Sequence, residues 1–475
     1  MREDLTLQTQ PSLRDRYKWW FLLLIVISKF QAFFNVASLG TLQVQFQQTI
    51  AMSEMEFSRI AAMQGIPGLA LPIFMGMLAD YYGAWVCVGI FIIAGILGQI
   101  LICIGIWTIS YWCILIGFVI EFAGVEIGVL GYHIINRAWY KDNELARVNS
   151  IMWILITVAA FISDIVYPNL YQLADSLELP YLVGLGIAIF SGVAGVLVLM
   201  IHQKMRNLQL IAAPKSEGRK QFSWKYITSL PKTYWILILS FSLGLVSFRA
   251  STLYESKFLQ TRFHYSVGTA GVMLSIGLAC AVIVNPIAGV WMDKVGRLPL
   301  FMIGALGFIV LGTIGNVVIP SCDRCFLPIV PLVTMSFPCG VIGIVNSSAV
   351  MRLVDPKNLG TSFAVLSTVY SIIQIIILEI NGFIAETTYE EWGYQWVFAL
   401  NVCIGSIALV FAVIMHVIDL RGKQKLQYVM SALHESSIIA PISESLIDTT
   451  ISKTQVVCDD SAGNVSNQIP LLGDS

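Results

Sequence analysis

Charged residues are scarce in this chain. Of its 475 residues, 12% are Asp, Glu, Lys or Arg and 57% are hydrophobic, whereas about 25% of the residues in a typical soluble domain are charged. This composition excludes an ordinary soluble enzyme and a disordered chain. The net charge of −1 excludes the positive field that nucleic-acid binding requires. Nine cysteines are too few for a disulfide framework in a chain of this length.

The short motifs of common catalytic sites are also missing. No HExxH, Walker P-loop or GxSxG segment occurs, so a zinc protease, a nucleotide-driven pump and an α/β-hydrolase are not expected. Cys322 and Cys325 form a CxxC without a second Cys or His pair nearby, which disfavours a zinc site. We therefore expect a protein that is not an enzyme and that holds no cofactor and no metal.

Long apolar runs dominate the sequence. A bilayer core about 30 Å thick requires about 20 apolar residues in one helix. Such runs are too long for strands, and only helices or closed barrels satisfy the backbone polar groups in lipid. The sequence therefore predicts an all-α membrane protein with twelve transmembrane helices, near residues 19–41, 58–79, 84–106, 110–134, 147–170, 180–201, 233–256, 267–292, 299–319, 326–350, 360–384 and 394–418.

Basic residues are unevenly distributed among the loops. If the N-terminus is cytoplasmic, 22 of the 28 Lys and Arg residues fall in cytoplasmic segments and three in outer loops. Cytoplasmic loops of membrane proteins carry an excess of Lys and Arg. We therefore expect both termini in the cytoplasm and outer loops that include residues 42–57, 171–179 and 385–393.

The longest loop between apolar runs divides the chain into two halves of six runs each, which suggests an internal repeat. The tail is rich in Ser and Thr and poor in aromatic residues, a composition typical of disorder. The predicted organisation is a cytoplasmic N-terminal segment (1–18), a six-helix bundle (19–201), a cytoplasmic loop (202–232), a second six-helix bundle (233–418) and a disordered cytoplasmic tail (419–475).

A loop motif, GxxxDxxG, occurs at the same place in both halves. It comprises Gly76, Asp80 and Gly83 in the first half and Gly289, Asp293 and Gly296, followed by Arg297, in the second. Glycine permits a tight turn between helices, and an Asp at a helix end can accept hydrogen bonds from a neighbouring helix end. A contact of this kind, formed in one conformation and broken in another, would act as a gate.

The paired motif resembles that of the major facilitator superfamily, and the resemblance extends over nearly all of residues 15–420. It implies two six-helix halves that expose a central site to each side of the membrane in turn. The first copy departs from the pattern, because Ala84 and Trp85 stand where the superfamily usually has basic residues.

Several segments also resemble a lysosomal dipeptide-transporter branch of this superfamily. They are Pro67 in the second run, the loop with Trp139, Tyr140, Lys141, Glu144 and Leu145, and the Leu359-Gly360-Thr361 segment. The resemblance implies dipeptide uniport, a lysosomal or other endomembrane location and a glycosylated accessory membrane protein, with the plasma membrane as an alternative location. Phe118, Thr157 and Ser256 replace basic residues of that branch, so the substrate class follows less directly than the fold.

Ionisable residues inside the apolar runs are candidates for substrate binding, because their cost in a membrane is usually offset by a cavity or a partner. A zwitterionic solute requires an anion for its ammonium group and a cation for its carboxylate. Glu126 is the candidate anion, and Lys29 or Arg249 the candidate cation. Glu126 or Lys29 could instead form an internal ion pair. Arg249, which is nearer the outer end of its run, could instead act in gating or snorkel toward the membrane surface.

Two polar stripes are further candidates. One contains Gln31 and Asn35 in the first run, and the other contains Tyr370 and Gln374 in the eleventh. Their side chains could orient a peptide-like group or hydrogen-bond between helices. Glu121 and Glu379 are candidates for proton coupling, because burial can bring the pKa of a carboxyl group toward neutral pH.

These observations predict a secondary or facilitative transporter that moves a small polar organic solute, with dipeptides or amino acids favoured, by alternating access. Its expected partners are this solute and the lipid bilayer. One alternative is a proton-coupled carrier of a monocarboxylate or a sugar. Another is a transport-inactive receptor or scaffold with the same fold.

Overall fold

The structure, a computed structural model, describes residues 13–69, 71, 74, 83–140, 142–208, 224–323, 325–354, 359–422 and 426. Within these residues, eleven helices are long and apolar enough to cross a membrane, which confirms the predicted all-α membrane fold. The remaining expected span, 58–79, begins in α4 (Glu54–Met63) and continues into positions outside the described residues.

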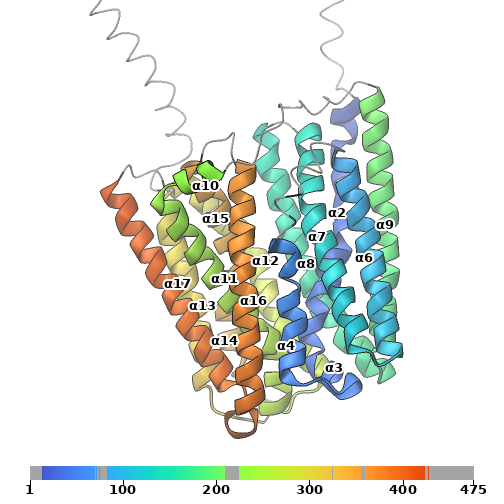
Figure 1. Cartoon of the computed structure of the whole chain (residues 1–475), viewed down its shortest axis with the longest axis vertical. Helices are drawn as coiled ribbons and strands as arrows, with labels where there is room; N and C mark the ends of the chain where they lie inside the picture. Colours follow the sequence, from blue (N-terminus) through green and yellow to red (C-terminus); the bar gives the residue numbers. More distant parts are fainter. Residues whose placement is uncertain are drawn as a thin grey trace, which may run out of the picture.

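The helices form two adjacent bundles (Figure 1). The N-terminal half contains α2 (Leu13–Thr41), α3 (Gln43–Ile50), α4, α6 (Ala84–Trp107), α7 (Tyr111–Trp139), α8 (Asp142–Ala174) and α9 (Glu178–Asn207). The C-terminal half contains α10 (Trp224–Ser229), α11 (Lys232–Arg262), α12 (Val267–Val295), α13 (Leu298–Val318), α14 (Ile329–Ser336), α15 (Cys339–Leu353), α16 (Leu359–Trp392) and α17 (Gln395–Arg421).

Two elements differ from the sequence expectation. The expected outer loop 42–57 contains α3, which follows α2 almost directly and buries one face, with Gln43, Gln45, Phe46 and Ile50. The expected single span 326–350 is divided into α14 and α15 at Phe337 and Pro338. Proline lacks the backbone N–H that would continue the helical ladder, which accounts for the break.

The beginning of α2 and the end of α17 lie at the same end of the molecule, at the top of Figure 1. We refer to this as the terminal end and to the opposite one as the distal end. At the distal end, α4 begins with a capping box, in which Ser53 Oγ accepts a hydrogen bond from Glu56 N and Ser53 N donates one to Glu56 Oε2. This arrangement satisfies helix-end amides from within the N-terminal half.

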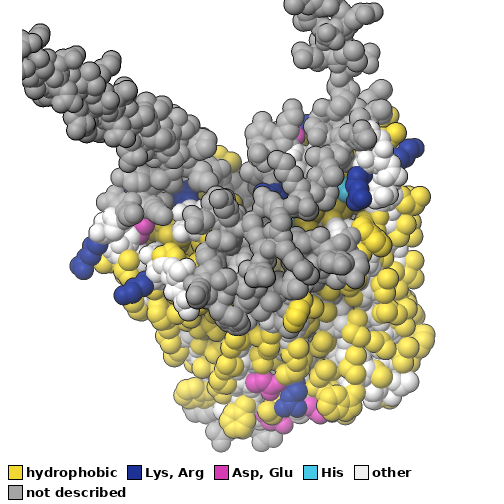
Figure 2. All heavy atoms as spheres, turned by 45° about the horizontal axis from the view of Figure 1, so that its top comes forward, with side chains coloured by type: hydrophobic (Ala, Val, Ile, Leu, Met, Phe, Trp, Pro, Cys, Tyr) yellow, Lys and Arg dark blue, Asp and Glu magenta, His cyan; other side chains and the backbone are white. Residues whose placement is uncertain are grey.

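The lateral surface of the molecule is apolar. On the face drawn in Figure 2, hydrophobic side chains cover most of the described lateral surface, and large residues such as Phe190, Leu311 and Val318 are exposed. In water such a surface would be unfavourable, whereas lipid tails solvate it. The surface therefore agrees with a multi-pass position in a membrane.

Candidate functional site

A cavity of about 260 Å³ lies between the two halves. Helices α2 and α8, with the C-terminal end of α4, contribute its wall on the N-terminal side, and α11, α12 and α16 contribute most of the wall on the C-terminal side. Pockets for drug-sized ligands occupy about 300–1,000 Å³, so this space suits a small solute. Its position between the halves is where alternating-access transporters bind their substrates.

Arg249 of α11 lies on the cavity wall and connects the two halves. Its Nη1 donates a hydrogen bond to Tyr370 Oη of α16 at 3.3 Å. On the opposite side, the guanidinium carbon lies 5.9 Å from the centroid of the Phe122 ring of α7, within the range of a cation–π contact. The charge of Arg249 also interacts with that of Glu126, which is one helical turn beyond Phe122.

Gln374 belongs to the same region. It lies one turn after Tyr370 on α16 and lines the cavity, while its Nε2 donates a hydrogen bond to the carbonyl oxygen of Ala61 at 3.3 Å. Of the predicted binding residues, Arg249 and Gln374 thus line the cavity. Tyr370 is hydrogen-bonded to Arg249, and Glu126 interacts with its charge, but neither of the two is part of the cavity lining. A cation that is hydrogen-bonded to a phenol and faces a carboxylate can bind the carboxylate of a solute.

Lys29 lies elsewhere. It is buried on α2, one turn toward the terminal end from the cavity-lining Phe33. Its Nζ lies 5.7 Å from the centroid of the Tyr132 ring of α7, and it lines a separate, much smaller space between α2 and α8. Lys29 and Arg249 therefore do not share one chamber in this conformation.

Gln31 and Asn35 point into the N-terminal bundle. A Cβ added to Gly95 of α6 would lie 2.4 Å from Gln31 Nε2, so this amide packs directly on α6. Asn35 Oδ1 accepts a hydrogen bond from Tyr167 Oη of α8 at 3.0 Å. Both residues thus make contacts between helices of one half, which is the alternative role considered for this stripe, namely hydrogen bonding between helices. Contact of Gln31 or Asn35 with a substrate stays a prediction.

The two candidates for proton coupling also lie outside the cavity lining. Glu121 is buried within the N-terminal bundle, against Gly98 of α6 and near the amide of Asn35. Glu379 forms an ion pair with Arg59 at 3.3 Å between α16 and α4. A coupling role for Glu121 or Glu379 therefore remains a prediction.

Polar contacts between the two halves close the distal end of the cavity. Lys257 of α11 forms an ion pair with Glu54 of α4 and donates a hydrogen bond to Gln47 of α3. Tyr394 Oη donates a hydrogen bond to Glu54 Oε1 at 2.8 Å, and Met55 N donates one to Glu386 Oε2 at 2.8 Å. Figure 2 shows acidic and basic side chains at this end. We call these contacts, with Arg59–Glu379, the distal closure.

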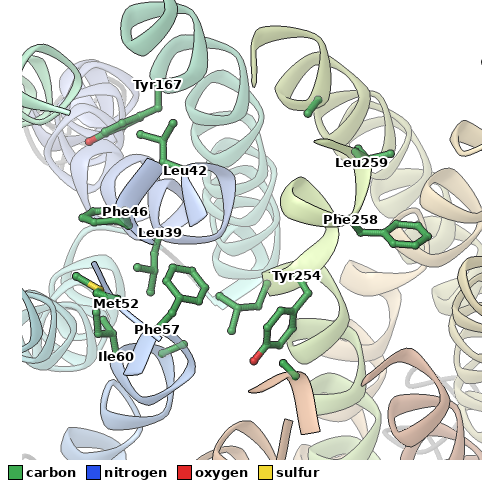
Figure 3. Close-up of a cluster of buried hydrophobic side chains, with 14 of the residues drawn as sticks. Leu39, Leu42, Phe46, Met52, Phe57, Ile60, Tyr167, Tyr254, Phe258 and Leu259 are labelled. Carbon is green, nitrogen blue, oxygen red and sulfur yellow. The ribbon is translucent and has the colours of Figure 1, made fainter. Parts of the chain in front are cut away.

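Apolar residues pack beside the distal closure. Leu39, Phe57 and Ile60 from the N-terminal half belong to one buried cluster with Tyr254 and Phe258 of α11, as Figure 3 shows. A substrate can therefore pass the distal end only if the halves separate there.

Sequence reasoning did not identify Glu54, Lys257 and Tyr394 as gate residues. The sequence did contain an indication of such a contact. Lys257 is one of the few basic residues expected on the outer side, and the outer loops 42–57 and 385–393 contain acidic residues. What the sequence lacked was the pairing between halves, because the partners are more than 200 positions apart in the chain.

The repeated loop motif is described only in part. Gly76 and Asp80 lie outside the described residues, as does the side chain of Asp293, so the predicted gating contacts stay predictions. Gly83 and Gly296 have φ values of +83° and +68°, in the region that favours glycine. Arg297 follows in the left-handed conformation at the start of α13. The tight turn expected from the motif is therefore present in the second copy, between α12 and α13, whereas of the first copy only Gly83 is described.

Replacing Gly296 with alanine should reduce the stability of the fold by about 1–3 kcal/mol, because the new Cβ strains a backbone at φ +68° and ψ −129°. Gly289→Ala provides the control, since its Cβ would meet no atom within 4 Å in a helix. Thermal unfolding of the two purified variants tests this expectation. Equal melting temperatures for both would contradict it.

The apolar lateral surface, the two bundles and the cavity between them, which has polar and charged side chains on its wall, are features of a multi-pass membrane transporter of small molecules. The sequence profile of the Major Facilitator Superfamily matches residues 22–378 and 236–429. The chain belongs to this superfamily. No curated protein matches the sequence.

Solved structures with the same fold support this assignment. The chain is similar to a D-xylose–proton symporter, with a TM-score of 0.65 and 14% identity over 83% of this chain and 97% of the other. It is also similar to a mutant of the peptide transporter POT in complex with alafosfalin (TM-score 0.62, 15% identity, 86% and 96% covered). A third is a bacterial homologue of the human lysosomal transporter Spinster (TM-score 0.60, 15% identity, 84% and 97% covered).

Proposed function

We propose that this protein moves a zwitterionic solute, an amino acid or a dipeptide, across a membrane by alternating access. The observation that carries the proposal is the chamber between the halves, which has Arg249 on its wall and is closed at the distal end. Arg249 binds the solute carboxylate, and Tyr370 holds the guanidinium in place. Glu126 balances this charge while the chamber is empty.

Transport requires that the distal closure opens and reforms. Its ion pairs and hydrogen bonds join α3 and α4 to α11, α16 and Tyr394, so it breaks when the halves rock apart. A solute shifts this equilibrium only through its different affinities for the two conformations. Arg249 can supply that difference, because the groups around it come from both halves.

We infer that the distal end faces the lumen or the outside. The excess of Lys and Arg on the terminal side supports this orientation. The disulfide between Cys322 and Cys325, in the segment between α13 and α14, also supports it, since disulfides persist in oxidising compartments. The resemblance to the dipeptide-transporter branch favours an endolysosomal membrane and a glycosylated accessory protein.

Uptake by proteoliposomes tests the proposed function. Alanyl-alanine and alanine are offered with and without a pH gradient, and uptake of at least one of them above protein-free vesicles is expected. Uptake that requires an inward proton gradient would identify symport rather than uniport.

Glu126→Gln should reduce the uptake of the transported solute by roughly tenfold, because it removes a charge that interacts with Arg249. Glu178→Gln, an exposed position at the start of α9, is the matched control and should behave as wild type. Unchanged transport of every solute by Glu126→Gln would remove Glu126 from the site.

The runner-up function is proton-coupled transport of a monocarboxylate. Arg249 favours it, because one guanidinium suffices for a solute whose only charge is a carboxylate. Uptake of lactate that exceeds uptake of both alanine probes under a proton gradient would establish this alternative.

A further inference from the structure

Two carboxylates from opposite halves line the distal part of the cavity. Asp164 is on α8 of the N-terminal half and Glu255 is on α11 of the C-terminal half; they are 8% and 1% exposed. Thr41 of α2 connects their surroundings. Its Oγ1 donates to Asp164 Oδ1 at 2.7 Å, and its carbonyl oxygen accepts from Oγ of Ser256, the neighbour of Glu255, at 2.6 Å. The two acids thus lie in one small region of the wall.

The neighbours of this pair do not neutralise it. Asp164 is hydrogen-bonded to the neutral Thr41, and Glu255 Oε1 accepts from the neutral Asn316 amide at 3.5 Å. The one basic residue on the described cavity wall is Arg249, which is hydrogen-bonded to Tyr370 and packs on the ring of Phe122. Buried carboxylates are costly unless they are paired, so this end of the cavity favours a cationic group.

Two side-chain amide atoms without a hydrogen-bond partner provide an independent indication of a ligand. Gln64 and Gln374 line the same cavity from opposite halves and are 3% and 2% exposed. Gln64 Nε2 and Gln374 Oε1 are buried and have no hydrogen-bond partner in the described part of the chain. Buried polar atoms are almost always hydrogen-bonded. A donor and an acceptor without partners therefore indicate that a polar solute completes this wall.

We infer that Asp164 and Glu255 together bind the ammonium group of the transported solute and that this binding draws the distal ends of the two halves together. The inference rests on the proposed function, and it moves the ammonium site from Glu126 to the distal acids. Two ionised carboxylates on opposite halves repel each other when the halves approach. An ammonium group between them replaces that repulsion with two attractions, so the occupied site favours the closed distal end.

The arrangement also orients the solute. The acids hold its ammonium group beneath the distal closure, and Arg249 holds its carboxylate at another point of the same chamber. The amides of Gln64 and Gln374 can bond to the polar groups between the two ends. A solute that lacks the ammonium group loses the contact that joins the halves, although it keeps the contact with Arg249.

A distance measurement between the halves tests this inference without requiring transport. Spin labels on non-natural side chains at Gln48 of α3 and Thr387 of α16, both exposed at the distal end, report closure in full-length protein in lipid nanodiscs. Alanyl-alanine should increase the population with the short distance. N-acetyl-alanyl-alanine, which keeps the carboxylate and lacks the ammonium group, should require a concentration at least roughly tenfold higher.

The variants Asp164→Asn and Glu255→Gln, singly and combined, should abolish this preference between the two probes. Both changes preserve size and an acceptor for the Thr41 or Asn316 donor, and the melting temperature checks the fold. The matched control, Asp175→Asn with Glu178→Gln, changes exposed acids near the distal end and should keep the preference.

Three results would overturn the inference. They are equal responses to both probes in the wild type, a preference that survives in the combined variant, and closure driven by acidification alone with no added effect of alanyl-alanine. The last result would assign the two acids to a proton. Failure of the proposed function is distinguishable: closure by alanyl-alanine without uptake rejects transport of this solute and retains the binding pair.

Discussion

Replacing Arg249 with alanine should reduce uptake of the transported solute roughly 100-fold, which corresponds to about 3 kcal/mol of lost interaction. Arg249 is the one basic residue on the described cavity wall, and its guanidinium group can donate two parallel hydrogen bonds to a carboxylate. Uptake of alanyl-alanine and alanine by proteoliposomes, normalised to the amount of folded protein, measures this loss.

Arg249→Lys separates charge from geometry. It keeps a positive charge but cannot donate two parallel hydrogen bonds to one carboxylate, so an intermediate loss of roughly tenfold is expected. The double variant Arg249→Ala with Glu126→Gln should lose less than the sum of the single effects, because it leaves no uncompensated Glu126 charge. Wild-type uptake by Arg249→Ala would show that the carboxylate binds elsewhere.

Replacing Lys257 with methionine should open the distal end. The ion pair between Lys257 and Glu54 is largely buried, with side chains 12% and 11% exposed, and Glu54 also accepts from Tyr394. Breaking a buried pair leaves a carboxylate without its cation. We expect a cost to the closed conformation of about 2 kcal/mol, which is a roughly 30-fold change in the ratio of closed to open molecules.

The distance between labels at Gln48 and Thr387 reports this change as a larger population at long distance. Lys294→Met, an exposed lysine at the terminal end, is the matched control and should leave the distribution unchanged. If Lys257→Met gives the wild-type distribution, the ion pair does not stabilise the closure and the apolar packing around Phe57 and Tyr254 is sufficient.

The fold could be predicted from the sequence because long apolar runs and loop charges reflect the bilayer directly. The exceptions have local causes. Helix α3 is too short and too polar to register as a span, and the break between α14 and α15 depends on where Pro338 falls within an apolar run. Neither position could be deduced from the count of apolar residues.

The site could be predicted only in part, because an apolar membrane helix does not reveal which of its faces is buried. Lipid-facing and protein-facing residues are both hydrophobic. Depth along the helix can be read from the sequence, which made Glu126 and Lys29 candidates, whereas rotation about the helix axis cannot. Gln31 and Asn35 have a spacing as regular as that of Tyr370 and Gln374, yet their stripe faces the interior of one bundle.

The capping box at the start of α4 has a consequence for the energetics of rocking. Ser53 and Glu56 belong to the same half as the amides that they satisfy, so this helix end stays intact when its neighbours withdraw. One amide, the backbone N–H of Met55, donates its hydrogen bond to Glu386 of the C-terminal half, and this hydrogen bond is exposed to solvent. Water can replace the lost carboxylate immediately. The amides at the N-terminal end of α4 therefore have hydrogen-bond partners whether the distal end is closed or open. The transport cycle does not require this end of the helix to unwind.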